Sequence, residues 1–202
     1  PLLFLHGAYA GAWCWESFLE GCASHGYDAY ALSFRGHGRS PQIAALDSYG
    51  IDDYVQDLES AIETLPQSPI LIAHSMGGFV AQRYLSRGGK VAALALLASV
   101  PPYGLTGSAL YMGMFYPRLL VGLNQFEFGP DAHPDLNMVR ELLFSADMTE
   151  QKLLEFAAAA QRESSRALME MMLPQPWRLW AMPQVPALVL GAANDRVIPE
   201  SD

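Results

Sequence analysis

The segment at residues 69–78 constrains the fold of this chain more than any other. It reads P-I-L-I-A-H-S-M-G-G, an apolar run that suits a buried parallel strand and ends in a serine between small residues. A helical pattern begins at Phe79, so Ser75 lies where a strand turns sharply into a helix. Ala73 and Gly77 leave room for that strained turn, and Gly78 lets helix and strand approach. The segment predicts a serine nucleophile on an α/β sheet, and the alternative is a glycine turn with Ser75 as a helix N-cap.

Residues 2–15 supply a candidate oxyanion-binding loop. Their letters, L-L-F-L-H-G-A-Y-A-G-A-W-C-W, describe an apolar strand that ends at His6-Gly7 and runs on into a helix. Backbone N–H groups held in a dry pocket stabilise the negative charge that acyl transfer builds on a carbonyl oxygen. We expect the N–H groups of Ala8 and Met76 to do this. The residues expected to line the site are His6, Gly7, Tyr9 and His74. The alternative is a plain glycine turn in which His6 bonds to the backbone.

A further apolar strand leads to the candidate acid. The segment at residues 185–199 reads V-P-A-L-V-L-G-A-A-N-D-R-V-I-P, with Asp195 four residues beyond Gly191. A carboxylate there can accept one imidazole N–H, which orients a histidine and leaves its other nitrogen facing the serine. The same aspartate also fits a turn or a helix N-cap. We favour the catalytic interpretation because Asp195 completes an ordered set with Ser75.

The chain resembles the α/β-hydrolase family over nearly its whole length. His6-Gly7 is similar to that family's oxyanion loop, A-H-S-M-G-G to its nucleophile elbow and G-A-A-N-D-R-V-I-P to its acid loop. The sequence S-F-R-G-H-G-R-S at residues 33–40 resembles another turn of the family, which we interpret as structural. Ala73 replaces a glycine, and Ser33 replaces an aspartate, of the commoner pattern. The resemblance implies an α/β fold with a mostly parallel, doubly wound sheet, and a helical lid inserted after the strand that follows the elbow helix.

The resemblance also places the catalytic histidine after the acid, yet no histidine follows Asp195. The five histidines of the chain are His6, His25, His37, His74 and His133. We assign His25 to a helix end and His37 to a surface turn, while His133 falls in the insert, where a base is not expected. We therefore expect a fragment that lacks the first strands and the last strand, helix and histidine. The competing interpretation is a complete protein that has lost its base.

Composition favours one globular enzyme domain with an insert. A chain of 202 residues that is 51% hydrophobic can bury a core, and its longest apolar stretch, residues 91–100, is too short to span a bilayer. A formal net charge of −9 without a basic run argues against nucleic acid and anionic membranes as partners, and we expect no stable membrane insertion. Cys14 and Cys22 lie too far apart in one helical segment for a disulfide, which favours a reduced, cytoplasmic location. We expect neither a metal site nor a cofactor.

The alternation of strand and helix stops after Pro101-Pro102. We divide the chain into a hydrolase core, residues 1–102 and 183–202, and a helical lid, residues 103–182. Helical patterns cover residues 108–120, 136–144 and 149–172, the last with Thr149 as N-cap. Eight of the nine methionines fall between Met112 and Met182, beside Tyr111, Phe115, Tyr116, Phe126, Phe128, Trp177 and Trp180. Because methionine-rich walls repack around ligands, we expect a lipophilic group under the lid, although ordinary helix packing accounts for most of these side chains.

Together these residues predict a hydrolase that cleaves a carboxylic ester, or a related acyl bond, of a lipophilic small molecule. The mechanism is of the Ser-His-Asp type, with Ser75 as nucleophile and Asp195 as acid. The loop H-G-A-Y-A-G-A-W-C-W also looks like that of plant methylesterases and hydroxynitrile lyases, so a C–C lyase that releases cyanide is one alternative. Another is a receptor-like member that binds its ligand with little turnover. A serine at the elbow disfavours the epoxide hydrolases and dehalogenases, which use aspartate.

Overall fold

Five short parallel strands form the central sheet. The computed structural model describes residues 1–119, 121, 136–173 and 184–199. The strands are β1 (Leu2–Leu5), β2 (Ala29–Leu32), β3 (Ile70–His74), β4 (Ala93–Leu97) and β5 (Ala187–Leu190), in the spatial order β2-β1-β3-β4-β5. Because every neighbouring pair is parallel, all the carboxyl ends meet at one edge. The order reverses between β1 and β3, the kind of point where open α/β sheets bind ligands, and the His6-Gly7 loop and Ser75 follow these two strands.

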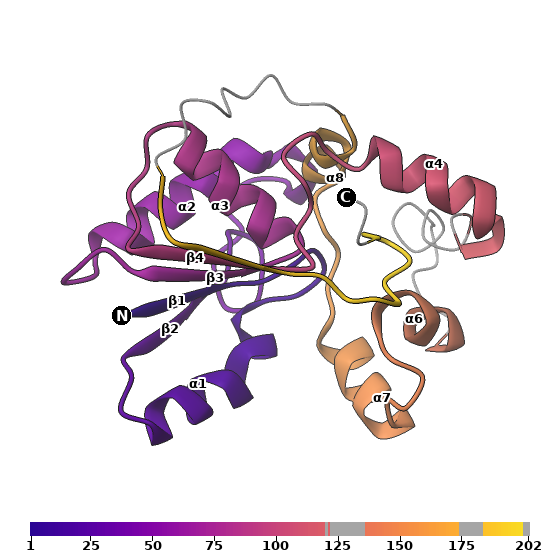
Figure 1. Cartoon of the computed structure of the whole chain (residues 1–202), viewed down its shortest axis with the longest axis horizontal. Helices are drawn as coiled ribbons and strands as arrows, with labels where there is room; N and C mark the ends of the chain where they lie inside the picture. The colour runs from indigo at the N-terminus through magenta and orange to yellow at the C-terminus, as the bar shows by residue number, and fades with distance from the viewer. Residues whose placement is uncertain (120, 122–135, 174–183, 200–202) are drawn as a thin grey trace.

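Helices cover both faces of the sheet, which confirms the expected doubly wound α/β fold. Figure 1 shows α1 (Glu16–Ser24) on one face, and α2 (Ile51–Glu63) and α3 (Met76–Ser86) side by side on the other. Two 3-10 helices, Ala12–Trp15 and Leu46–Ser48, precede α1 and α2. Helices on both faces of a parallel sheet bury its inner strands on both sides, so these strands are read as apolar runs rather than as alternating patterns.

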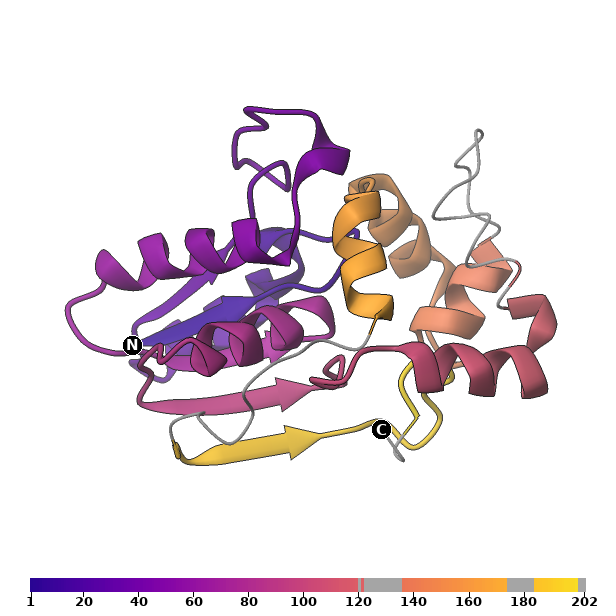
Figure 2. The same ribbon diagram turned by 90° about the horizontal axis from the view of Figure 1, so that it is seen from above.

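The helices that follow β4 lie beside the carboxyl-end edge of the sheet, as Figure 2 shows. They are α4 (Thr106–Phe115), α6 (Leu136–Leu143), α7 (Glu150–Ala159) and α8 (Ser165–Met172). Thr149 caps α7 as predicted, because its side chain accepts the N–H of Lys152. The prediction of one continuous helical pattern over residues 149–172 is wrong, since residues 160–164 are extended or irregular and separate α7 from α8.

One core joins the sheet, α2, α3 and part of the insert. Phe34, Tyr54 and Phe79 are fully buried at its centre, and Leu168 and Met171 of α8 pack against it. The strand β5, by contrast, forms the sheet edge in the described chain, and Val189 at its middle is 68% exposed. The insert is therefore joined to the core mainly through α8, whereas β5 carries apolar side chains at the surface.

Some predictions fall outside the residues that the structure describes. These concern His133, Phe126, Phe128, Trp177, Trp180 and Met182, together with parts of the predicted lid at residues 103–182. Among the helices that are described, none combines the length and the apolar character needed to cross a bilayer.

Candidate active site

Ser75 occupies a strained turn between β3 and α3. Its backbone dihedrals are φ 50° and ψ −119°, a combination that residues other than glycine rarely adopt. The turn is held from both sides: the Ser75 N–H donates to the carbonyl of Leu97 at 3.1 Å, and the Ser75 carbonyl accepts the N–H of Gly78 at 3.0 Å. The serine is thus presented by a backbone that the surrounding structure fixes.

The two glycines after the serine permit two different close approaches. A Cβ atom on Gly77 would lie 2.6 Å from the carbonyl oxygen of His6 and 2.8 Å from that of Leu5, so α3 begins against the end of β1. A Cβ on Gly78 would lie 2.6 Å from the Cβ of Ser99, which follows β4. Gly78 therefore permits a close approach of the helix to the end of β4, as predicted, and Gly77 permits a second one to the end of β1.

The predicted oxyanion loop lies directly beside the serine. A Cβ atom on Gly7 would be 3.1 Å from the Cβ of Ser75 and 2.8 Å from Nδ1 of His74. Met76 is the first residue of α3, and the first N–H groups of a helix have no acceptor within it. Tyr9, with φ 65°, turns the loop back immediately after Ala8. The loop and the helix start thus meet at Ser75, where a carbonyl group attacked by the serine would lie.

The side chain of His6 holds this loop through hydrogen bonds to the backbone. It is fully buried, its Nε2 accepts the N–H of Phe34 at 3.1 Å, and its Nδ1 lies 2.8 Å from the carbonyl oxygen of Gly7. A nitrogen that accepts a hydrogen bond carries no proton, so Nδ1 holds the proton and donates it to Gly7. Burial lowers the pKa of His6 to about 4, which keeps the ring neutral. The His6 side chain is therefore bonded to the backbone, as the alternative interpretation of this loop expected.

The side chains of His74 and Tyr9, both expected to line the site, differ in their exposure. His74 ends β3 next to the serine, and its side chain is exposed. The side chain of Tyr9 is buried in the core, so this residue contributes its backbone to the loop.

Asp195 lies in the loop after β5, on the same edge of the sheet. Its Oδ1 accepts the N–H groups of Val197 and Ile198 at 2.8 and 2.9 Å, which is the turn-aspartate geometry. Within the described chain, Oδ2 has no hydrogen-bond partner and can accept an imidazole N–H. Arg196, the next residue, pairs with Glu141 of α6 and lies 5.1 Å from the ring centre of Tyr116. The acid loop is thereby fastened to the insert.

The R-G-H-G turn has a structural role, but the surface position predicted for His37 is wrong. Arg35 donates its backbone N–H and its Nε to the two carboxylate oxygens of Asp57 on α2. His37 is fully buried, with its Nε2 3.0 Å from Oε2 of Glu163 in the insert. Burial opposes charge on His37, yet the Glu163 carboxylate raises its pKa above the ordinary value. A partner 126 positions along the chain explains why no local pattern could indicate this burial.

Two other site-associated residues were missed from the sequence. Gln161 and Glu163 belong to the break between α7 and α8, and both reach the core beneath the oxyanion loop. The only available signal was the polar interruption Q-R-E-S-S within an apolar helical pattern.

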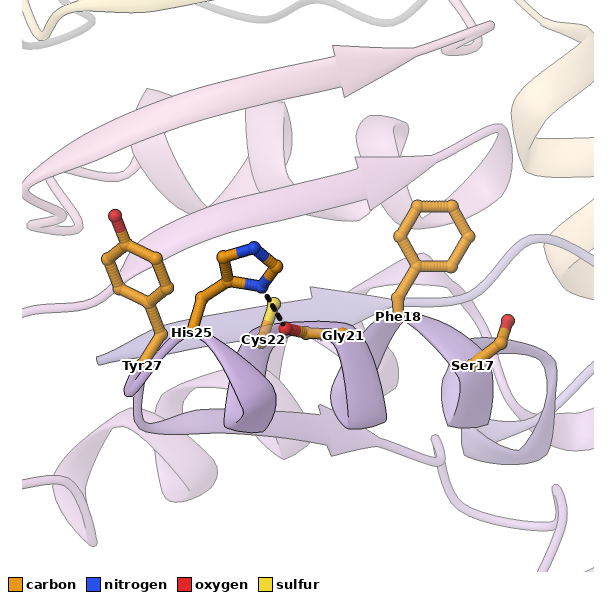
Figure 3. A pocket seen from close by; sticks show the side chains of 6 residues that line it. All are labelled: Ser17, Phe18, Gly21, Cys22, His25 and Tyr27. Atoms are coloured by element: carbon orange, nitrogen blue, oxygen red, sulfur yellow. Dashed lines mark hydrogen bonds between the residues drawn. The ribbon is translucent and has the colours of Figure 1, made fainter.

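A shallow hollow of about 490 Å³ lies elsewhere, along α1. Figure 3 shows its lining, which consists of Ser17, Phe18, Gly21, Cys22, His25 and Tyr27. His25 closes the end of α1, as predicted, with Nδ1 bonded to the carbonyl of Gly21. None of these residues belongs to the loops around Ser75, so the hollow is distinct from the candidate site. Among the described residues, no three His, Cys, Asp or Glu side chains gather as a metal site requires.

The geometry around Ser75 agrees with a comparison of the sequence against protein families. The model described as "Alpha/beta hydrolase family" matches residues 2–201. The chain belongs to the alpha/beta hydrolase family. The family match covers the Ser75 turn, the His6-Gly7 loop and the Asp195 loop together.

Curated relatives within the family are named as peroxidases and esterases. The chain is 33% identical over 105 residues to non-heme chloroperoxidase CPO-A1 of Kitasatospora aureofaciens, which is 50% of this chain and 38% of the relative. It is 35% identical over 78 residues to methylesterase 18 of Arabidopsis thaliana, which is 38% of this chain and 29% of the relative. The chain thus covers well under two thirds of these relatives' own length.

Solved structures share the alpha/beta hydrolase fold over nearly the whole chain. An extracellular α/β-hydrolase from a Paenibacillus species aligns with a TM-score of 0.74 at 19% identity, covering 99% of this chain and 81% of that one. A bromoperoxidase from Bacillus anthracis aligns with a TM-score of 0.68 at 22% identity, covering 98% and 75%. Likeness at this level of identity establishes the fold and leaves the reaction to be argued from the site.

Proposed function

We propose that this protein hydrolyses carboxylic esters of lipophilic small molecules, with Ser75 as the nucleophile. The observation that carries the proposal is the strained Ser75 turn with Gly7 packed against it, because nucleophile and oxyanion donors must converge on one reacting carbonyl. Ser75 Oγ attacks that carbonyl while the N–H groups of Ala8 and Met76 bind the oxyanion. The alcohol then leaves, and water releases the acyl group from the serine.

We assign the general base to a histidine outside the described residues, oriented by Asp195. The buried rings of His6 and His37 are each committed to neighbouring groups, and His25 closes α1. His74 directly precedes Ser75 in the sequence, whereas in this family the base follows the acid. Oδ2 of Asp195, which has no hydrogen-bond partner among the described residues, is the atom proposed to accept the imidazole N–H.

The preference for a lipophilic substrate rests on the insert. Residues of α4 beside the carboxyl-end edge expose large apolar side chains, namely Leu110, Tyr111, Met114 and Phe115. Methionine and aromatic side chains adapt to apolar ligands at low cost. Acyl or alcohol groups with extended apolar chains are therefore the expected substrates.

The test is turnover of p-nitrophenyl esters of increasing acyl length by the protein expressed from its complete gene. We expect kcat/KM to rise with chain length and Ser75→Ala to abolish turnover. An Asp195→Asn variant should lower kcat by about 10⁴-fold, the scale known for loss of a triad aspartate. Cyanide release from cyanohydrins without ester turnover would instead favour the lyase, and tight ligand binding without turnover would favour the receptor-like function.

A second candidate, perhydrolysis at the same serine, is favoured by the names of the relatives. The matches include several non-heme chloroperoxidases and a bifunctional esterase/perhydrolase of Acinetobacter calcoaceticus. Hydrogen peroxide would attack the acyl-serine in place of water. The acyl group would then leave the serine as a peroxy acid, and the serine hydroxyl would be regenerated. Peroxy acid formation from acetate ester and peroxide, absent in Ser75→Ala, is the expected signal. If the carboxylic acid remains the product of ester turnover when peroxide is present, perhydrolysis is excluded.

A further inference from the structure

The connection between α7 and α8, residues 160–164, is bonded to the oxyanion loop and to the R-G-H-G turn at once. The backbone N–H of Gln161 donates to the carbonyl of Tyr9 at 3.0 Å. The Gln161 side chain accepts the N–H of Gly38 at 2.7 Å and donates to the carbonyl of Gly36 at 2.6 Å. One residue of the insert therefore joins two core loops that lie about thirty positions apart in sequence.

Glu163 anchors this connection in the core by a buried charge. The residue is 3% exposed, and its Oε1 accepts the hydroxyl of Tyr54 at 2.6 Å and the N–H of Ser164 at 2.7 Å. Its Oε2 faces Nε2 of His37 at 3.0 Å, and Nδ1 of His37 faces the carbonyl of Arg35 at 3.1 Å. Both ring nitrogens of His37 thus face acceptors, an arrangement that favours the charged imidazolium beside the Glu163 carboxylate. Removing one partner of such a pair leaves the other charge buried and unpaired.

The buried pair is in contact with the histidine that holds the oxyanion loop. The ring centres of His37 and His6 lie 5.3 Å apart, and His6 in turn bonds to the carbonyl of Gly7. Phe34, whose N–H donates to His6, stacks on Tyr54 at 5.0 Å. Glu163 and the Gly7–Tyr9 backbone are therefore joined both through Gln161 and through a packed layer of rings.

We propose that Gln161 and Glu163 are positioning residues that hold the oxyanion loop in its catalytic geometry, so that one connection seats the insert and sets the oxyanion hole. The catalytic consequence rests on the proposed ester hydrolysis, whereas the positioning of the loop does not. Neither residue touches the reacting atoms; both act through the backbone of Gly7, Ala8 and Tyr9. Oxyanion donors are effective only when their positions are fixed before the reaction, so a looser loop should slow chemistry more than it weakens binding.

The experiment compares Glu163→Gln with the matched control Glu170→Gln. The first variant keeps an oxygen for Tyr54 and Ser164 but loses the charge that faces His37. Glu170 also ties the insert to the core, accepting the N–H of Ile51 at 2.8 Å and pairing with Arg166, and these partners belong to α2 and α8 rather than to the oxyanion loop. We expect Glu163→Gln to lower kcat at least about tenfold with KM within about twofold, on the scale of a small misplacement of catalytic groups. Amide hydrogen exchange in residues 5–12 should also quicken, and Glu170→Gln should change neither quantity.

Exchange of residues 5–12 decides the proposal even without catalysis. If the wild type turns over no ester, the proposed function fails, while faster exchange of the loop in Glu163→Gln alone still supports the positioning role. If Glu163→Gln lowers the melting temperature but leaves kcat and loop exchange like those of Glu170→Gln, the pair only stabilises the fold and the proposal is wrong. Gln161→Ala, which removes the bonds to Gly36 and Gly38 without burying a charge, provides the same comparison if Glu163→Gln does not fold.

Discussion

Gly77 is the single residue on which the elbow geometry depends most. Any side chain there would meet two backbone carbonyls of the β1 end, which cannot move as a flexible side chain can. We predict that Gly77→Ala destabilises the protein by about 2–3 kcal/mol, as overpacking does, and displaces Met76 and the start of α3. Urea unfolding measures the stability, and ester turnover reports the displacement.

Gly21 offers the matched control for that substitution. It lies within α1, and an added Cβ there meets no atom within 4 Å. Gly21→Ala should therefore stabilise the protein by about 0.5–1 kcal/mol through helix propensity. Equal effects of the two substitutions would show that the close approach at Gly77 is not what constrains the elbow.

His6 makes the stability of the protein depend on pH between about 6.5 and 4. Its pKa in the folded protein is about 4, below the ordinary 6.5, because burial disfavours the charged ring. The unfolded chain therefore binds a proton at higher pH than the folded chain, and the stability present above pH 6.5 is lost as the pH falls toward 4. At about 1.4 kcal/mol for each pKa unit, this loss amounts to about 3 kcal/mol. Urea unfolding at intervals across this pH range measures it.

A His6→Gln variant separates this titration from that of the carboxylates. The variant should be less stable at pH 7, because the bonds to Phe34 and Gly7 are weakened. Its stability should, however, fall less steeply between pH 6.5 and 4 than that of the wild type. Parallel curves for the two proteins would mean that His6 is not buried in its neutral form.

At the scale of elements, α7 and α8 begin with comparable N-caps in different surroundings. Thr149 caps α7 in an exposed position, whereas Ser164 caps α8 while fully buried and donates its hydroxyl to the carbonyl of Tyr49 at 2.5 Å. We predict that Thr149→Ala costs about 1 kcal/mol and Ser164→Ala about 2–3 kcal/mol, since the second change also leaves a buried carbonyl unpaired. Thermal unfolding of both variants tests this order, which would be contradicted by equal losses.

The same comparison shows what sequence patterns could predict about the elements. Thr149 was predictable as a cap because the signal, a threonine before an apolar helical stripe, is local. The break before Ser164 was not, because residues 149–172 have helical periodicity and their polar interruption has its partners in Tyr9, Gly36 and His37. Those partners lie more than a hundred positions away, where a local pattern carries no information.

At the scale of the molecule, the sheet order brings the predicted site residues to one edge. Ser75 and the Gly7 loop were predictable because each follows an apolar strand, and parallel strands end together. The burial of His37 and the exposure of β5 were not predictable, because both depend on which distant segments pack alongside. The fold and the Ser75 turn are thus encoded locally, whereas the contacts that support the Gly7–Tyr9 loop come from the insert.

The central claim is that Ser75 is an activated nucleophile, and active-site titration with a fluorophosphonate tests it most directly. The measurement is the intact mass of the protein expressed from its complete gene, before and after labelling, beside a Ser75→Ala control. The account predicts one adduct on the wild type, none on Ser75→Ala, and slower labelling of Asp195→Asn. A folded wild-type protein that gains no adduct, or an adduct that persists in Ser75→Ala, would contradict it.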